Sequence, residues 1–222
     1  METSSKPILG YWKIRGLGSP IRYLFEYTGV EYEETQYEQG DAPDYSVEVW
    51  TLSKPTLGLD FPNLPYLIYG DVKLTETIAI LRYICNKWAP ELLGKTPEDK
   101  AFADMTFNYL WEYRNAVVNH SYSTGDRAQI VKIGNEKLGE VVGKVLLGKK
   151  FVCGDDLTYV DFFLFEKIEV ANFLSEGEFL KNYPIFIDFH KRITSLPRFS
   201  DYYNSDKFMR GPFNNKIAKI NN

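Results

Sequence analysis

The stretch from Phe61 to Leu74, FPNLPYLIYGDVKL, decides the fold of the first half of the chain. Two apolar runs, residues 66–69 and 72–74, flank Gly70-Asp71, and this spacing predicts a two-residue β-hairpin. Apolar residues then recur with a helical period over residues 75–88, and Pro90 ends that pattern. The stretch therefore predicts two antiparallel strands followed by a helix.

The residues before this hairpin predict a β-α-β unit. Residues 7–14, PILGYWKI, have the apolar and aromatic character of a short strand. Ser19-Pro20 is typical of a helix start, because a hydroxyl caps free N–H groups and proline needs none at the first helical position. Gly29 is a natural helix end, and residues 32–37 alternate as a second strand. Residues 39–47 predict a loop, and residues 50–59 show no clear period.

The second half of the chain carries helical patterns almost exclusively. Residues 98–122 place their apolar side chains on one face of a long helix, whereas residues 125–147 form a weaker helical pattern interrupted by three glycines. Thr158 and Asp161 have the spacing of a capping box before a nearly all-apolar, buried helix. The fold class is therefore an α/β domain of β-α-β-β-β-α order, residues 1–89, joined to an all-α domain, residues 90–222.

Composition excludes several classes of protein. Of 222 residues, 44% are hydrophobic and 25% charged, as in a globular protein, and 26 basic against 30 acidic residues leave −4 with no long basic run. This balance argues against nucleic acid as a partner. No stretch reaches eighteen uninterrupted apolar residues and the N-terminus lacks a secretory apolar segment, so we expect a cytoplasmic protein that does not enter a membrane.

The cysteines and histidines are too few for a metal centre or a disulfide framework. Cys85 and Cys153 do not form a C-x-x-C pair, and His120 and His190 add little metal-binding capacity. Cys85 lies in a helical apolar pattern and Cys153 beside a glycine, so both are expected to be packing residues. We expect no metal and no resident cofactor.

Four segments carry a resemblance to a known family. LGYWKIRGL (9–17), GDAPDY (40–45), LGLDFPNLPYLI (57–68) and VDF (160–162) resemble the mu class of cytosolic glutathione transferases. The resemblance implies a thioredoxin-like glutathione-binding domain, then a helical domain with an electrophile pocket and dimer contacts. It also implies that glutathione is the co-substrate. The enzyme would favour the thiolate form of glutathione and conjugate it to hydrophobic electrophiles, as in detoxification.

Tyr11, at the end of the first expected strand, is the catalytic residue that this resemblance implies. The thiolate is the nucleophilic form of glutathione, yet a free thiol has a pKa of roughly 8.5 and is mostly protonated at neutral pH. A phenol that donates a hydrogen bond to sulfur near the positive start of a helix favours the thiolate. Tyr11 is therefore expected to lower the pKa of the bound thiol.

The resemblance also implies the residues that bind the rest of glutathione. Trp12, Trp50 and Lys54 would bind the glycine end, and Asn63 would contribute an amide. Leu64, held before a cis Pro65, would offer its backbone to the cysteinyl unit as an added strand does.

The γ-glutamyl group is assigned to Glu76-Thr77 at the start of a helix, with Thr77 and the helix amides receiving its carboxylate. Glu112 would reach the γ-glutamyl amine bound by the partner subunit. The mu class commonly has Gln-Ser in place of Glu76-Thr77 and an aspartate in place of Glu112.

Three further roles come from the same resemblance. Tyr122, Trp12 and Leu17 would line the electrophile pocket, together with residues 210–217. Ten helical residues separate Glu112 from Tyr122, about 280° around the helix axis, so these side chains face different directions. Phe61, on a proline-bounded loop, would insert into an apolar pocket of a second copy and make the protein a homodimer.

Other functions of the same fold remain open at this point. One is a glutathione-binding carrier or structural protein without turnover, against which the retained Tyr11 argues. A sigma-like glutathione-dependent isomerase differs only in its substrate. A thiol oxidoreductase would need a cysteine near Tyr11, and residues 10–16 contain none.

Overall fold

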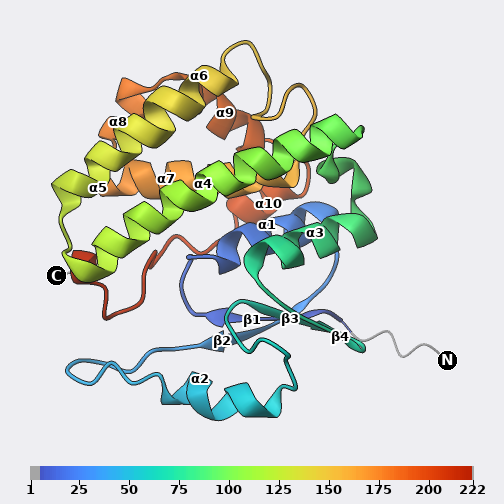
Figure 1. The fold of residues 1–222 in the computed structure, drawn as a ribbon, viewed down its shortest axis with the longest axis vertical. Helices are drawn as coiled ribbons and strands as arrows, with labels where there is room; N and C mark the ends of the chain where they lie inside the picture. The colour runs from blue at the N-terminus through green and yellow to red at the C-terminus, as the bar shows by residue number, and fades with distance from the viewer. Residues whose placement is uncertain (1–5, 222) are drawn as a thin grey trace.

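A computed structural model describes residues 6–221. The first half contains a four-stranded sheet of order β2-β1-β3-β4 (Figure 1). The strands are β1 (Ile8–Trp12), β2 (Glu33–Tyr37), β3 (Tyr66–Tyr69) and β4 (Val72–Thr75), with β1 parallel to β2 and antiparallel to β3. The predicted hairpin is confirmed, because Tyr69 pairs with Val72 across Gly70-Asp71 and Gly70 has the positive φ of 59° that this turn requires.

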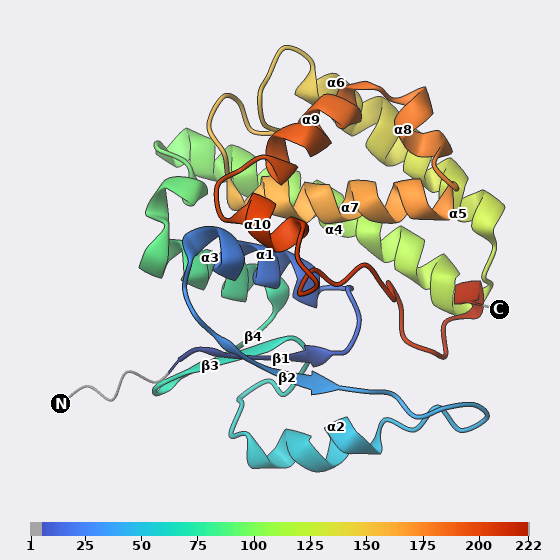
Figure 2. The ribbon, with the colours of Figure 1, turned by 180° about the vertical axis from the view of Figure 1, so that it is seen from behind.

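Helices lie on both sides of this sheet. α1 (Gly18–Thr28) and α3 (Thr77–Trp88) lie between the sheet and the helical half, and α2 (Glu48–Ser53) lies beyond the opposite face (Figure 2). Gly29 ends α1 in a left-handed conformation, as predicted. Ser19 is not the helix cap, however. Its N–H donates to the carbonyl of Arg15 at 2.9 Å, so α1 begins before Ser19.

The helix α2 and the 3₁₀ turn η1 (Lys54–Thr56) were not predicted, because residues 50–59 lack a period. In this six-residue helix only Trp50 is buried, so no repeating apolar pattern can arise. Trp50 stacks on Tyr66 with ring centroids 6.2 Å apart and meets Tyr37 edge-on at 5.3 Å. A single aromatic anchor therefore holds α2 against the sheet.

The second half is helical, as expected. Its elements are η2 (Pro90–Leu93), α4 (Pro97–Ser123), α5 (Arg127–Ile133), the π-helical η3 (Gly134–Val142), α6 (Gly143–Leu146), α7 (Tyr159–Leu174), α8 (Glu178–Asn182), α9 (Ile185–Thr194), α10 (Phe199–Tyr203) and η4 (Lys219–Asn221). The predicted capping box at Thr158 and Asp161 is confirmed, and α7 behind it is almost entirely buried.

The glycines of residues 125–147 do not interrupt the helix there, contrary to expectation. Helical backbone continues from α5 through η3 into α6. A Cβ atom on Gly139 would lie 2.3 Å from the ring of Tyr183, so a glycine is needed for the chain around Tyr183 to approach. Tertiary packing thus accounts for a residue that weakens the local helical pattern.

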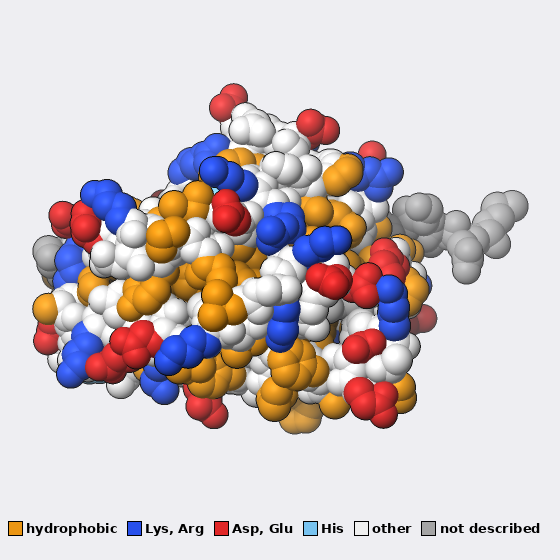
Figure 3. Space-filling model, turned by 90° about the horizontal axis from the view of Figure 1, so that it is seen from above, with side chains coloured by type: hydrophobic (Ala, Val, Ile, Leu, Met, Phe, Trp, Pro, Cys, Tyr) orange, Lys and Arg blue, Asp and Glu red, His pale blue; other side chains and the backbone are white. Residues whose placement is uncertain are grey.

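The surface carries both signs of charge. On the face that Figure 3 shows, basic and acidic side chains are interspersed among apolar ones. Within residues 6–221, no helix is both long and apolar enough to cross a membrane.

Candidate active site

A cavity of about 300 Å³ lies between the two halves of the molecule. Its walls come from the β1–α1 connection, from Leu64, from one face of α4, from α7 and from the C-terminal segment. The predicted residues Tyr11, Trp12, Leu17, Leu64 and Tyr122 all line it, and Phe213 to Asn215 contribute from the expected C-terminal stretch. The structure therefore brings together side chains as far apart in sequence as Tyr11 and Asn215.

Tyr11 is buried on β1 at the edge of this cavity. Its hydroxyl oxygen accepts a hydrogen bond from the Leu17 N–H at 2.9 Å, which leaves the phenolic proton available to another acceptor. Burial raises the pKa of Tyr11, and this effect outweighs the Leu17 N–H and the nearby Arg114 guanidinium, which both lower it. Tyr11 is therefore a neutral phenol at physiological pH and can act as a hydrogen-bond donor.

Two glycines, one just before α1 and one at its first residue, leave the space that the Tyr11 ring occupies. A Cβ atom on Gly16 would lie 2.6 Å from the Tyr11 hydroxyl oxygen, and one on Gly18 would lie 2.6 Å from Cδ1 of the ring. Gly16 also has a φ of +42°, which favours glycine. The sequence analysis did not assign these residues to the site, although the pair of glycines directly after the tyrosine-bearing strand was the available signal.

Of the predicted glycine-end residues, Trp12 lines the cavity, whereas Trp50 and Lys54 are not among the residues of its wall. Trp12 is half-buried in the wall, Trp50 is buried in the cluster with Tyr66, and Lys54 is half-buried on η1. The Leu64–Pro65 peptide bond is cis, as predicted. The Leu64 N–H donates to Oδ1 of Asn63 at 2.9 Å, so a peptide that pairs with this N–H must first displace the Asn63 side chain.

Thr77 has an unusual environment at the start of α3. Its side chain is 1% exposed, and its hydroxyl oxygen has no hydrogen-bond partner among the described residues. Glu76 before it is exposed and has a positive φ of 68°, a conformation that L-residues rarely adopt. A buried hydroxyl beside the free N–H groups of a helix start provides the donors that a carboxylate needs.

α4 presents two different faces, as its spacing predicted. Glu112 is exposed and Tyr122 lines the cavity, where its hydroxyl oxygen accepts the Asn215 N–H at 2.9 Å. Burial raises the pKa of Tyr122, so this phenol also stays protonated. Arg114 lies on the cavity face as well and was not predicted, because an arginine within a long helix is usually solvated.

Lys167 on α7 is the second site residue that the sequence analysis missed. Its side chain is 5% exposed, lines the cavity, and places Nζ 4.5 Å from the centroid of the Phe163 ring. Burial lowers its pKa to about 7 and outweighs the opposing effect of Glu166, while Arg114 and Arg15 lower it further. The available signal was a lysine within a sixteen-residue, mostly apolar segment that forms a buried helix.

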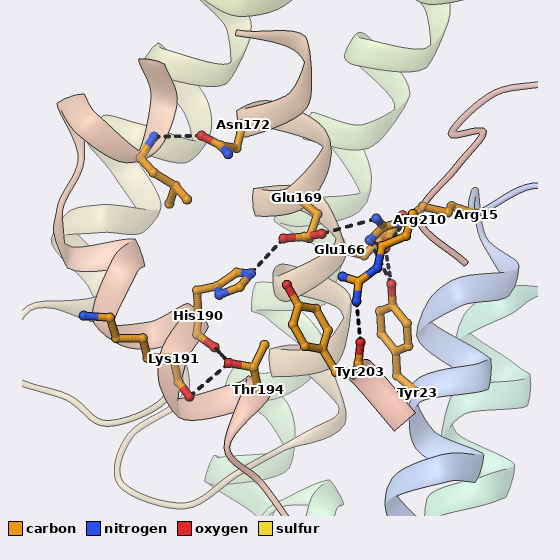
Figure 4. Close-up of polar contacts among 11 residues, drawn as sticks. Arg15, Tyr23, Glu166, Glu169, Asn172, His190, Lys191, Thr194, Tyr203 and Arg210 are labelled. Atoms are coloured by element: carbon orange, nitrogen blue, oxygen red, sulfur yellow. Dashed lines mark hydrogen bonds and ion pairs between the residues drawn. The ribbon is translucent and has the colours of Figure 1, made fainter. Parts of the chain in front are cut away.

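Arg15 forms the ion-pair network that Figure 4 shows between the β1–α1 connection and α7. Its Nη2 lies 2.7 Å from a Glu166 oxygen, and its Nη1 lies 3.2 Å from Glu169, which also contacts His190 at 2.7 Å. The Tyr23 hydroxyl donates to the same Glu166 oxygen at 2.5 Å. Burial alone would lower the pKa of Arg15, but Glu166 raises it, so this guanidinium stays charged.

Phe61 and the cysteines lie outside the cavity wall. Phe61 is 79% exposed in the single chain. Cys85 is buried, and burial raises the pKa of Cys153 to about 11, so Cys153 is protonated at neutral pH.

Comparison with known proteins identifies the family. Residues 7–86 match the family model for the glutathione S-transferase N-terminal domain, and residues 114–206 match a model for the glutathione S-transferase C-terminal domain. The chain therefore belongs to the glutathione S-transferase family, and the family resemblance inferred from sequence is confirmed.

The similar full-length proteins place it near one class of that family. The chain is 42% identical to glutathione S-transferase Mu 1 of Bos taurus, over 95% of this chain and 96% of that protein. It is 41% identical to glutathione S-transferase Mu 1 of Oryctolagus cuniculus, over 92% and 93%. The crystal structure of the glutathione S-transferase Blo t 8 superposes with a TM-score of 0.84 at 30% identity, over 96% of this chain and 99% of that one.

Proposed function

We propose that this protein is a glutathione transferase of mu-class type, which activates the thiol of glutathione and transfers it to hydrophobic electrophiles. The observation that carries this proposal is Tyr11, a neutral phenol whose oxygen is held by the Leu17 N–H while its proton faces no internal base in the hydrogen bonds described. Such a donor stabilises a thiolate better than a thiol. The sulfur then forms a bond to the electrophilic carbon as the leaving group departs, and the thiol proton goes to solvent.

We place the tripeptide along the sheet side of the cavity. Trp12, Trp50 and Lys54 would bind the glycine carboxylate, and Leu64 would pair with the cysteinyl unit after Asn63 releases its N–H. The unpartnered hydroxyl of Thr77 supports a γ-glutamyl carboxylate at the start of α3.

Glu76 would accept a hydrogen bond from the γ-glutamyl amine, together with Glu112 of a second copy. Tyr122, Trp12 and Leu17 would contact the electrophile, since they line the same cavity as Tyr11. We also propose that the two domains divide at residues 89 and 90.

Replacing Tyr11 with phenylalanine tests the proposal directly. We expect glutathione affinity to be retained, kcat at neutral pH to fall by about 10², and the pH–rate profile to shift toward the ordinary thiol pKa. Turnover of chlorodinitrobenzene with and without glutathione measures this, and Tyr69→Phe outside the cavity is the matched control. Glutathione binding without turnover in the wild-type protein would instead favour a carrier, and an unchanged pH–rate profile in Tyr11→Phe would remove Tyr11 from the mechanism.

We further propose that the protein is a homodimer. The exposed Phe61 ring supports this, because an isolated aromatic ring on a proline-bounded loop suits insertion into a neighbouring chain. Two symmetric Phe61 contacts would form in a two-fold dimer. Sedimentation equilibrium at micromolar concentration should give twice the chain mass of 25.7 kDa, and Phe61→Ser should shift the protein toward monomer. A wild-type mass of one chain would contradict the dimer.

A further inference from the structure

Two basic side chains of the cavity wall are not used in the activation of glutathione proposed above. Arg114 projects from α4 and Lys167 from α7, and both line the same cavity as Tyr11. Neither forms an ion pair with an acidic side chain among the described residues. Arg114 donates to the neutral amide oxygen of Asn115 at 2.9 Å and lies 5.4 Å from the Trp111 ring centroid, and Lys167 lies against Phe163.

Glu166 is the acidic residue in the cavity wall, and other groups already occupy it. Nε and Nη2 of Arg15 lie 3.2 Å and 2.7 Å from its two oxygens, and the Tyr23 hydroxyl lies 2.5 Å from one of them. Figure 4 shows this carboxylate on the side of Arg15 and Tyr23. Arg15 and Tyr23 therefore already balance the negative charge of Glu166, which is not available as a counter-charge for Arg114 and Lys167.

Partial burial of Arg114 and nearly complete burial of Lys167, without a carboxylate beside them, are unfavourable for the empty protein. Burial lowers the pKa of Arg114 despite the opposing effects of Tyr11 and Tyr122, and it lowers the pKa of Lys167 to about 7. An anion placed between the two side chains would favour both charged forms and would form charge-assisted hydrogen bonds. The rest of the wall is largely apolar, with Leu17, Val117, Val118, Val170 and Phe213.

We propose that Arg114 and Lys167 select electrophiles that carry a carboxylate on an apolar or aromatic body. This inference rests on the proposed transferase function and names the substrate class of its second site. The carboxylate would bind between α4 and α7, the apolar body would contact the valines and Phe213, and the reactive carbon would face the sulfur held near Tyr11. Neutral electrophiles would leave both cations without a counter-charge and would bind less well.

A matched pair of electrophiles tests the inference. 4-Chloro-3,5-dinitrobenzoate and its carboxamide react alike: the glutathione sulfur bonds to the ring carbon, the carbon–chlorine bond breaks, and chloride leaves with the electron pair. The measured quantity is the ratio of kcat/KM for carboxylate and carboxamide, divided by the same ratio for the uncatalysed reaction. We expect a ratio of about ten or more in wild type, as for a charge-assisted contact.

Two variants on different helices locate the effect. Arg114→Leu and Lys167→Met should each lower this ratio about tenfold, and Lys144→Met on the exposed side of α6 should leave it unchanged. A wild-type ratio near one would overturn the inference. An equal loss for both electrophiles would also overturn it, because the cations would then stabilise charge that develops during the reaction. A rise in the KM of glutathione that accounts for the loss would overturn it as well, by assigning the cations to the tripeptide.

Binding of unreactive 3,5-dinitrobenzoate gives a readout that does not depend on turnover. The groups that act on Lys167 are Glu166 on its own helix, Arg15 on the β1–α1 connection and Arg114 on α4, with the Tyr11 and Tyr122 phenols in the same wall. Since an added carboxylate raises the pKa of Lys167, binding at pH 8 should take up roughly half a proton.

Calorimetry in buffers of different ionisation enthalpy measures this uptake, which should vanish in Lys167→Met and for 3,5-dinitrobenzamide. Uptake that persists in Lys167→Met would overturn the inference. If neither electrophile is turned over with glutathione, the proposed function fails, while preferential binding of the carboxylate would still support this site.

Discussion

Two groups of basic side chains lie in or beside the wall of the cavity and differ in what neutralises their charge. Arg15 is 1% exposed and has Glu166 and Glu169 within ion-pair distance. Arg114 and Lys167 line the cavity, and neither has an acidic side chain in the ion pairs of residues 6–221. The difference teaches that a charged side chain paired with acidic neighbours stabilises the fold, whereas one without an acidic neighbour is available to bind an anionic ligand.

A similar comparison separates two other buried polar groups. The Asp161 carboxylate accepts the Val152 and Thr158 N–H groups, both at 2.8 Å, and this buried group belongs to a helix cap. The Thr77 hydroxyl is equally buried but has no partner among the described residues. Because an unsatisfied buried polar group costs about 1–3 kcal/mol, such groups mark the places where binding of a ligand recovers stability.

Removing the partner of Arg15 should have the largest effect. Glu166→Gln keeps the size of the side chain but leaves a buried guanidinium without its main counter-charge, so we expect the free energy of unfolding to fall by about 3 kcal/mol. Urea denaturation followed by circular dichroism measures this. Glu136→Gln is the control, since Glu136 meets Lys132 at 3.9 Å on the surface and its loss should cost less than about 0.5 kcal/mol. Equal losses of unfolding free energy in Glu166→Gln and Glu136→Gln would contradict the distinction between a buried and a surface ion pair.

Lys167 should show the opposite behaviour, because it has no acid to lose. Its pKa is lowered to about 7 in the folded protein from 10.5, so the unfolded chain holds this proton more tightly and stability falls as the pH drops from above 10.5 toward 7. Between pH 9 and pH 7 the wild type should lose about 2 kcal/mol relative to Lys167→Met. Urea denaturation of both proteins at the two pH values measures the difference.

Lys144→Met provides the matched control for this pH dependence. Lys144 is exposed on α6, so its removal should leave the change in stability between pH 9 and pH 7 as in wild type. A parallel change in stability for Lys167→Met and wild type would show that Lys167 keeps its ordinary pKa, and the contrast with Arg15 would then be lost.

Thr77 should give the smallest effect, and on binding rather than on folding. Thr77→Val removes a hydroxyl that has no internal partner, so we expect little loss of stability and a five- to tenfold weaker affinity for glutathione, about 1 kcal/mol. Isothermal titration measures this affinity. Thr106→Val is the control, because the Thr106 hydroxyl donates to the Phe102 carbonyl at 2.8 Å and its loss should affect stability alone. Unchanged affinity in Thr77→Val would remove the γ-glutamyl carboxylate from the start of α3.

Local sequence predicted most of the elements that position the site. The hairpin at Gly70-Asp71, the end of α1 at Gly29 and the capping box at Thr158 depend on interactions within a few residues, and all are confirmed. Two of the failures occurred where distant residues decide. α2 is held by the contact of Trp50 with Tyr66, and Gly139 of η3 allows the approach of Tyr183.

The sequence by itself determined the two-part fold, the family and the position of Tyr11, because hydrophobic period, turn residues and motifs are local properties of a chain. The tertiary structure alone decided which side chains share the cavity. Arg114 and Lys167 lie on separate helices. The packing of these helices brings Glu166 to Arg15 and leaves the two cations in the cavity wall that Tyr11 also lines. Charge compensation is a property of distances in space, and the linear sequence does not contain those distances.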